Sequence, residues 1–169
     1  FDMKRPIYLI SVDPSGAVIG CVRLLPTTQT TMVETRFPAL LGCQQAPCSE
    51  DIWEGSRIAV DTQKAHFISK NGVSRTLAEL SLSVIELGML YKLRSVCFVT
   101  DIRVERILRT IGIRYERFET PKVMGTTRAV FGSVNISEQQ LEFIRAQSEI
   151  TEPTLCMPVY AEETEREHV

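Results

Sequence analysis

Three side chains that could do chemistry lie together in the stretch WEGSRIAVD, whose composition is otherwise that of a β-strand. Glu54 could accept a proton, Ser56 could act as a nucleophile, and Arg57 could hold a carboxylate through two hydrogen bonds. Buried strands normally exclude such groups, because an unpaired charge that leaves water is costly. Glu54 and Arg57 are therefore either a structural ion pair or part of a reactive site.

The spacing of these residues bears on that choice. Residues three apart on a regular strand point to opposite faces, so Glu54 and Arg57 share a site only if the backbone is irregular near Gly55 or the strand begins after it. A glycine inside a strand often marks a bulge, and bulges often lie beside active sites. Ser56 has no histidine partner in EGSR and lies outside a G-x-S-x-G turn, which argues against a nucleophilic serine.

Length and composition limit the class of protein. A chain of 169 residues with 44% hydrophobic residues, 24% charged residues and a net charge of -2 fits one globular domain without a nucleic-acid partner. We expect no membrane partner, since no apolar run approaches the ~20 residues that cross a bilayer. The two histidines have no partners at ligand spacing, so we expect no metal. The five cysteines are Cys21, Cys43, Cys48, Cys97 and Cys156. Because they form no CxxC pairs, they predict reduced thiols and a cytoplasmic location.

The pattern along the chain predicts a mixed sheet with helices on its faces. Residues 7–13 and 17–25 read as a hairpin joined by DPSG, and residues 30–42 as a short strand or turn followed by an apolar cluster. An amphipathic helix spans 74–93, with Ser74 as its N-cap. The remaining elements are strands at 95–101, 113–119 and 126–136, a helix at 104–112 closed by Gly112, and a helix at 137–147 with a capping box of Ser137 and Gln140.

Four short motifs, in order along the chain, resemble the bacterial acyl-homoserine-lactone synthases, also called autoinducer synthases. They are FD at Phe1 and Asp2, CVRLLPTT around Arg23, RFP at Phe37, and WEGSRIAVD with Glu54 and Arg57. The likeness continues through VERILRTIGI, although Ile58 stands where the family usually has Phe. The resemblance implies a GNAT-like α/β fold, with a mixed, mostly antiparallel sheet between helices in three layers. It also implies that residues 1–169 are a single synthase domain lacking the family's leading segment.

The resemblance implies two substrates, S-adenosylmethionine and an acyl thioester on acyl carrier protein or coenzyme A, without a cofactor. The substrate amine attacks the thioester, and its carboxylate then closes the lactone and expels methylthioadenosine. An α-ammonium with a pKa near ~8 must first lose its proton, so Glu54 is the candidate base. The other expected site residues are Arg23 and Arg57 as orienting cations, Asp2 completing the charged cluster, and Phe37 and Ser56 contacting substrate. Packing alone would instead place Phe37 in the apolar cluster with Leu40 and Leu41.

An acyl tunnel and a docking surface are also expected. Phe98 and Thr100 share one face of their strand, next to a helix whose Leu80 and Val84 could line a tunnel. In the family a Thr on this strand is associated with 3-oxo acyl chains, and our alignment places Phe98 there, with Thr100 as the alternative. Arg103, Arg106 and Arg109 are either a carrier-docking stripe or a solvated basic face.

Two other functions stay open on the sequence alone. One is an ordinary GNAT N-acyltransferase using acyl-coenzyme A, but DTQKAHFISKNGVS offers only Gly72 for the pyrophosphate loop Q/R-x-x-G-x-G/A. The other is a non-catalytic module that binds acyl thioesters.

Overall fold

The computed structural model describes residues 6–64, 67–68 and 72–157, and all statements below concern these residues. Its helices and strands, in chain order, are β1 (Ile7–Val12), β2 (Val18–Pro26), α1 (Met32–Arg36), the 3-10 helix η1 (Pro38–Leu41), β3 (Ile52–Val60), β4 (Phe67–Ile68), β5 (Val73–Ser74), α2 (Arg75–Leu90), β6 (Ser95–Asp101), α3 (Ile102–Thr110), β7 (Glu116–Arg117), β8 (Lys122–Met124), β9 (Thr127–Asn135) and α4 (Glu138–Ser148).

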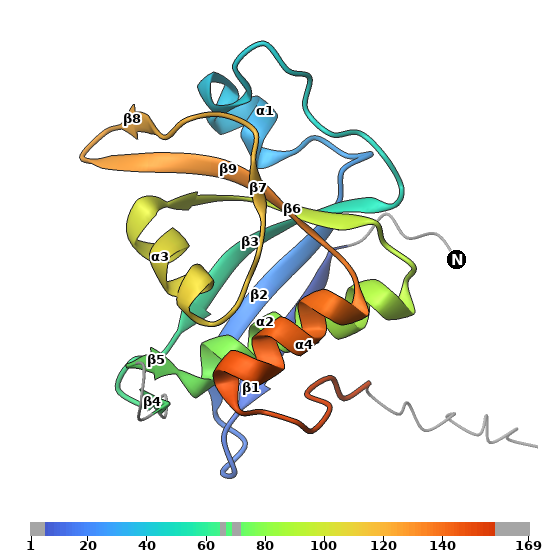
Figure 1. Cartoon of the computed structure of the whole chain (residues 1–169), viewed down its shortest axis with the longest axis vertical. Coiled ribbons are helices and arrows are strands. Elements are labelled where there is room, and N and C mark those ends of the chain that lie inside the picture. The colour runs from blue at the N-terminus through green and yellow to red at the C-terminus, as the bar shows by residue number, and fades with distance from the viewer. Residues whose placement is uncertain (1–5, 65–66, 69–71, 158–169) are drawn as a thin grey trace, which may run out of the picture.

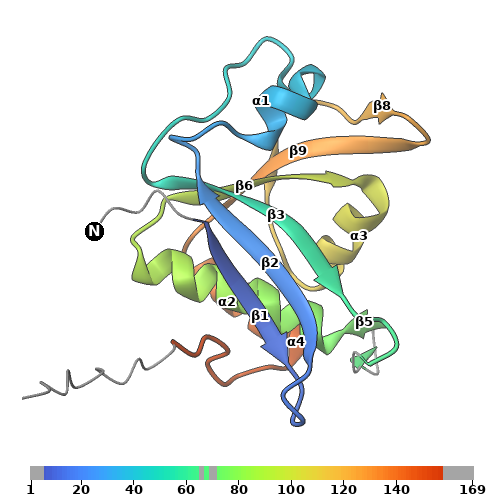
Figure 2. The ribbon, with the colours of Figure 1, turned by 180° about the vertical axis from the view of Figure 1, so that it is seen from behind.

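The main sheet is mixed and mostly antiparallel, as the sequence predicted. Its order is β1-β2-β3-β6-β9-β7, with β8 also pairing with β9, and β3 with β6 is its parallel pair. The helices α2 and α4 lie side by side against one face (Figures 1 and 2). On the opposite face, α1 and η1 pack through Val33, Leu40 and Leu41 on Cys97 and Phe131. The three-layer arrangement of helices, sheet and helices is thus confirmed.

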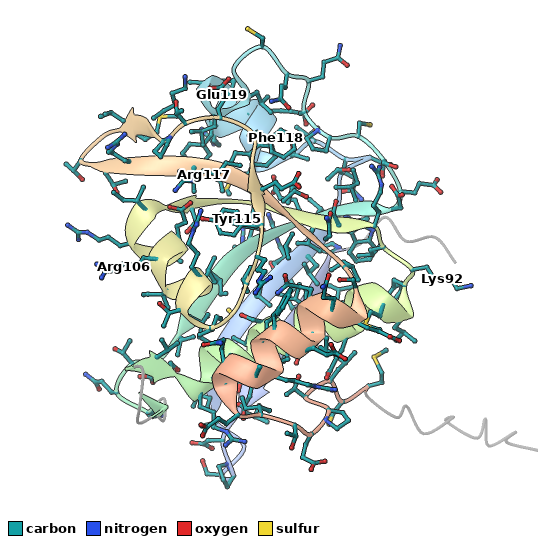
Figure 3. The ribbon with its side chains drawn as sticks, in the orientation of Figure 1. Lys92, Arg106, Tyr115, Arg117, Phe118 and Glu119 are labelled. Atoms are coloured by element: carbon teal, nitrogen blue, oxygen red, sulfur yellow. The ribbon has the colours of Figure 1, made fainter. Side chains whose placement is uncertain are left out.

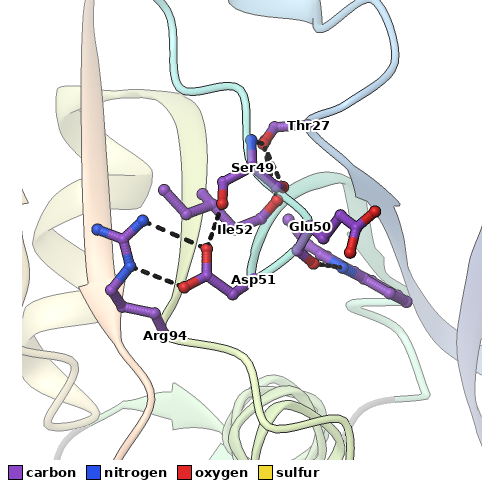
Figure 4. A network of polar contacts seen from close by, with 7 residues as sticks. Thr27, Ser49, Glu50, Asp51, Ile52 and Arg94 are labelled. Atoms are coloured by element: carbon purple, nitrogen blue, oxygen red, sulfur yellow. Dashed lines mark hydrogen bonds and ion pairs between the residues drawn. The ribbon is translucent and has the colours of Figure 1, made fainter.

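Parallel pairing between β3 and β6 is short. It runs from Ile52 with Ser95 to Gly55 with Phe98 and then stops, although both strands continue. Figure 4 shows the contacts that fix its start: the Asp51 carboxylate accepts hydrogen bonds from Arg94 Nε at 3.0 Å and from Ser49 Oγ at 2.5 Å. The strands are therefore tied at one end and free to diverge at the other.

The segment 30–42 differs from the expected short strand or turn. Residues 32–36 form α1, because Thr31 and Glu34 make a reciprocal capping box at its start. The Thr31 backbone N–H and hydroxyl both donate to Glu34 Oε2, at 2.9 and 2.7 Å. The T-x-x-E pattern was the signal for this helix, and the hydrophobic pattern alone did not reveal it.

Three smaller expectations need correction. The strand expected at 113–119 is limited to Glu116–Arg117. Ser74 is the N-cap residue of α2, but its hydroxyl is buried without a hydrogen-bond partner. Ser137 caps α4 through the Gln140 N–H, whereas the Gln140 side chain donates to the Gly112 carbonyl and so takes no part in a capping box.

Candidate active site

The irregular backbone in β3 lies at Arg57, two residues after the expected position. Arg23 pairs with Ser56 and Cys21 with Ala59, so Arg57 and Ile58 together face one residue of β2. Arg57 takes a φ of 55°, in the left-handed region that few residues other than glycine occupy. Its side chain is exposed, and no ion pair joins it to Glu54 in the described part of the chain. The two residues are therefore not a structural ion pair.

Glu54 is fully buried on the α1 face of β3. Its Oε2 accepts hydrogen bonds from the first two amides of α1, Met32 N at 2.8 Å and Val33 N at 3.4 Å. Its Oε1 is buried without a hydrogen-bond partner. Burial raises the pKa of Glu54, while the Met32 and Val33 amides and the charge of Arg23 lower it. The Glu54 side chain is thus held through Oε2, whereas Oε1 is unpaired.

Arg23 lies beside Glu54 on the same face of the sheet. Its Nε donates to Ser56 Oγ at 3.0 Å, which joins β2 to β3 at the point where the bulge begins. Phe37, half-buried at the end of α1, packs against the same cluster as Val33. Cys97 belongs to the same cluster. Its burial, and to a smaller extent the charge of Glu54, raises the pKa of this thiol to about 12, so the thiol is not a nucleophile.

An apolar cavity of about 120 Å³ opens where β3 and β6 diverge. Met32 and Ser56 line it on the side of Glu54, and Phe98, Thr100 and Val84 line it toward α2 and α3. The remaining lining residues are Val22, Leu24, Gly55, Arg57, Ile58, Ser81, Ile85, Val96, Val99, Val104, Leu108, Ile113 and Val134. The cavity therefore connects the surroundings of the Glu54 carboxylate with the face of the sheet that α2 covers.

Leu80 does not line this cavity. It is buried in the core, where a Cβ at Gly20 of β2 would lie 3.0 Å from its Cδ1. Asp2 lies outside the described residues. No group of three potential metal ligands occurs within the described ranges.

The three arginines of the expected docking stripe differ in their surroundings. Arg103 and Arg106 are exposed, and Arg106 points away from the molecule on the side opposite Lys92 (Figure 3). Arg109 donates from Nε to the Tyr115 hydroxyl at 2.9 Å and lies 3.7 Å from Glu105. Arg103 and Arg106 are therefore available to a partner, whereas Arg109 is engaged within the protein.

The sequence analysis missed a polar cluster around Glu105. This buried carboxylate accepts hydrogen bonds from Arg117 Nε at 2.6 Å, from a second Arg117 nitrogen at 2.7 Å, and from the Tyr115 hydroxyl. Burial raises the pKa of Glu105, but the bonds from Arg117 and Tyr115 outweigh it and the net direction is downward. The spacing within the helix could have predicted this cluster. Glu105 lies four residues before Arg109 and on the same helix face as Leu108.

No helix in the part of the chain that the structure describes is long and apolar enough to span a bilayer. All five cysteines are free thiols.

Known proteins resemble this chain over most of its length. An acyl-homoserine-lactone synthase from Vibrio anguillarum is 35% identical over 140 residues, covering 82% of this chain and 72% of that protein. The TofI structure in a ternary complex with an inhibitor and MTA has 26% identity and a TM-score of 0.68, over 92% of this chain and 76% of that one. The CoA-dependent acyl-homoserine lactone synthase BjaI, with SAM and isopentyl-CoA, shares the fold at 20% identity and a TM-score of 0.72, over 88% of this chain and 66% of that one.

The chain thus spans about two thirds to three quarters of these proteins. The GNAT-like fold expected from the sequence is confirmed by the structural matches. The profile of the family described as autoinducer synthase matches residues 1–144. The chain therefore belongs to the autoinducer synthase family.

Proposed function

We propose that this protein is an acyl-homoserine-lactone synthase that acylates the amine of S-adenosylmethionine and releases a quorum-sensing lactone with methylthioadenosine. The observation that carries the proposal is the buried Glu54 carboxylate, with Oε2 fixed by α1 and Oε1 unpaired. Two residues that line the apolar cavity lie next to this carboxylate. The Met32 amide donates a hydrogen bond to Glu54, and Ser56 lies two positions after Glu54 in β3. A base and an acyl cavity thus lie together.

The chemistry assigns roles to the charged residues. Glu54 accepts a proton from the substrate ammonium, directly or through one water, and the freed amine attacks the thioester carbonyl. The carbon–sulfur bond of the thioester breaks and the thiol leaves. The substrate carboxylate then attacks the carbon next to its own sulfonium, which expels methylthioadenosine. Arg23 or Arg57 orients that carboxylate, Asp2 completes the charged cluster, and Phe37 and Ser56 contact substrate.

The cavity is proposed to hold the acyl chain. Phe98 lines this apolar space, and a phenyl ring gives a buried 3-oxo group no hydrogen bond. We therefore propose a donor without a 3-oxo group, and one that is short, branched or aromatic. Thr100 lines the same cavity, so the decisive measurement is kcat/KM for matched donors with and without the 3-oxo group. Preference for a long 3-oxo donor would refute this assignment.

The relatives support the choice of substrates. TofI was solved with MTA, and BjaI with SAM and isopentyl-CoA. We propose S-adenosylmethionine and an acyl thioester as substrates here, with the thioester carried by acyl carrier protein or coenzyme A and docked at the exposed arginines of α3. No cofactor or metal is proposed, and the proposed location is the cytoplasm.

Mass spectrometry of the products separates the candidate functions. The protein is incubated with S-adenosylmethionine and a set of acyl thioesters. Acyl-homoserine lactone together with methylthioadenosine is the expected result. An acylated amine without methylthioadenosine would indicate an ordinary GNAT acyltransferase, and no turnover would indicate a binding module.

A further inference from the structure

The ring of Phe98 leans across the sheet toward β9. Phe98 pairs with Gly132 in the antiparallel β6–β9 ladder, and a Cβ built on Gly132 would lie 3.3 Å from Phe98 Cζ. The far end of the ring therefore lies above the glycine, in space that any other residue at this position would share. Because Gly132 has no side chain, Phe98 can line one wall of the cavity rather than cross it.

Tyr115 packs against the Phe98 ring. The rings of Phe98 and Tyr115 meet edge to face, with centroids 5.3 Å apart and an interplanar angle of 71°. Tyr115 also lies over Gly132, since a Cβ there would be 2.9 Å from Tyr115 Cδ2. Tyr115 itself does not line the cavity, whereas the Phe98 ring that it contacts does.

The Glu105 cluster holds Tyr115 in turn. The Tyr115 hydroxyl donates to Glu105 and accepts from Arg109 Nε, and the Arg109 guanidinium lies 4.8 Å from the centre of the tyrosine ring. Arg117 binds both oxygens of Glu105. These residues belong to α3 and the segment that follows it, where Figure 3 labels Tyr115 and Arg117. The tyrosine is thus held at both its hydroxyl and its ring.

We propose that Gly132 and Tyr115 determine the size of the acyl group that the cavity accepts, by holding the Phe98 ring against β9. This inference rests on the proposed function, because it concerns the acyl end of that site. A Cβ at position 132 would lie 2.9 Å from Tyr115 Cδ2, 3.1 Å from the Glu116 carbonyl oxygen and 3.3 Å from Phe98 Cζ. The Tyr115 ring must then shift, and the Phe98 ring is pressed toward the cavity. Loss of the tyrosine ring would do the opposite, because Phe98 could then retreat into the vacated space.

The test measures how affinity depends on the length of the alkyl group. The probes are S-butyl and S-hexyl pantetheine thioethers, which carry the arm common to both proposed donors and cannot react. Calorimetry gives the ratio of hexyl to butyl affinity. Gly132→Ala should lower this ratio roughly tenfold, because two methylenes lose their buried space. Tyr115→Ala should raise it, while Tyr115→Phe, which keeps the ring, should leave it near the wild-type value.

Two controls separate this effect from damage to the sheet. In Gly132→Ala combined with Phe98→Ala the ratio should recover, because the ring that blocks the cavity is gone. Ser133→Ala, at the next residue of β9, should leave the ratio unchanged. A wild-type ratio in both Gly132→Ala and Tyr115→Ala would overturn the inference, as would a low ratio that persists in the double variant. Failure of the proposed function is a different result: length-dependent binding without any lactone formed.

Discussion

Glu54 combines burial, a fixed oxygen and an unpaired oxygen, which makes it the residue whose substitution is most informative. Glu54→Gln keeps the size of the side chain and an oxygen for the α1 amides, but removes the base. We expect kcat/KM to fall by ~10²-fold or more with the fold intact, as far-ultraviolet circular dichroism would verify. Near-normal activity of this variant across the pH range would rule out the assigned role.

The stability of the protein should report the same burial. Burial raises the folded-state pKa of Glu54, so the protonated form contributes stability that is present at low pH and is lost as pH rises through the folded-state pKa. The Glu54→Gln variant cannot ionise, so its stability does not fall in this way as pH rises. Thermal unfolding across the range above the ordinary glutamate pKa should therefore show the wild type falling relative to the variant. Parallel curves would contradict the assigned protonation behaviour.

At the scale of elements, α1 links the cap at Thr31 to the position of the Glu54 carboxylate, the proposed base. The first amides of this short helix bind Glu54, and the capping box holds the turn that presents them. Thr31→Val removes the hydroxyl of the cap at a cost of ~1 kcal/mol. We expect about tenfold lower kcat/KM from the resulting displacement of Met32 and Val33, with Thr31→Ser restoring activity.

The pH profile distinguishes this effect from a general loss of stability. The Met32 and Val33 amides lower the pKa of Glu54, so loosening them should move the acid limb of kcat/KM to higher pH. Other groups that face Glu54 are Arg23 on β2, Glu34 on α1 and Cys97 on β6. Thr31→Val leaves Arg23 and Cys97 in place but removes the hydroxyl that binds Glu34, so Thr31→Ser, which keeps that hydroxyl, is the matched comparison. An unshifted acid limb with lower activity would mean that the cap acts on stability alone.

Elements with a strong periodic pattern were predictable from the sequence, and those made by local polar contacts were not. The hairpin of β1 and β2 and the helix α2 follow from alternation and helical spacing. In contrast, α1 depends on a four-residue cap, and the bulge at Arg57 depends on how β3 aligns with β2. A glycine often marks a bulge, so the sequence predicted the bulge near Gly55. Its true position could not be predicted, because the sequence does not give the register between strands.

At the scale of the whole molecule, the site arises from contacts between segments that sequence reasoning could not place together. The family resemblance predicted Glu54 and Arg23 as site residues, but the donors that hold Glu54 come from α1, more than twenty residues earlier along the chain. The cavity exists because β3 and β6 are tied at one end and diverge at the other. Leu80 has the helical spacing of a lining residue, yet it packs into the core beside Gly20.

The exposed arginines of α3 give a prediction about the acyl donor. Arg103 and Arg106 face solvent on an otherwise slightly acidic protein, and an acidic carrier protein would be attracted to them. Arg106→Glu should lower kcat/KM for a protein-borne acyl group about tenfold at low salt, and adding Arg103→Glu should lower it further. The loss should shrink as salt is added, because exposed charges are screened. A small acyl thioester should be used as well as by the wild type.

Lys92→Glu is the matched control for this docking surface. Lys92 is exposed, its reversal changes the net charge by the same amount as Arg106→Glu, and it lies on the opposite side of the molecule in Figure 3. If the α3 arginines form the dock, Lys92→Glu should leave the use of both donors unchanged. Arg109 is left untouched, because its contact with Tyr115 would mix docking with the shape of the acyl cavity. Equal losses on the protein-borne and small donors, or an equal loss in Lys92→Glu, would reject α3 as the docking surface and favour a solvated basic face.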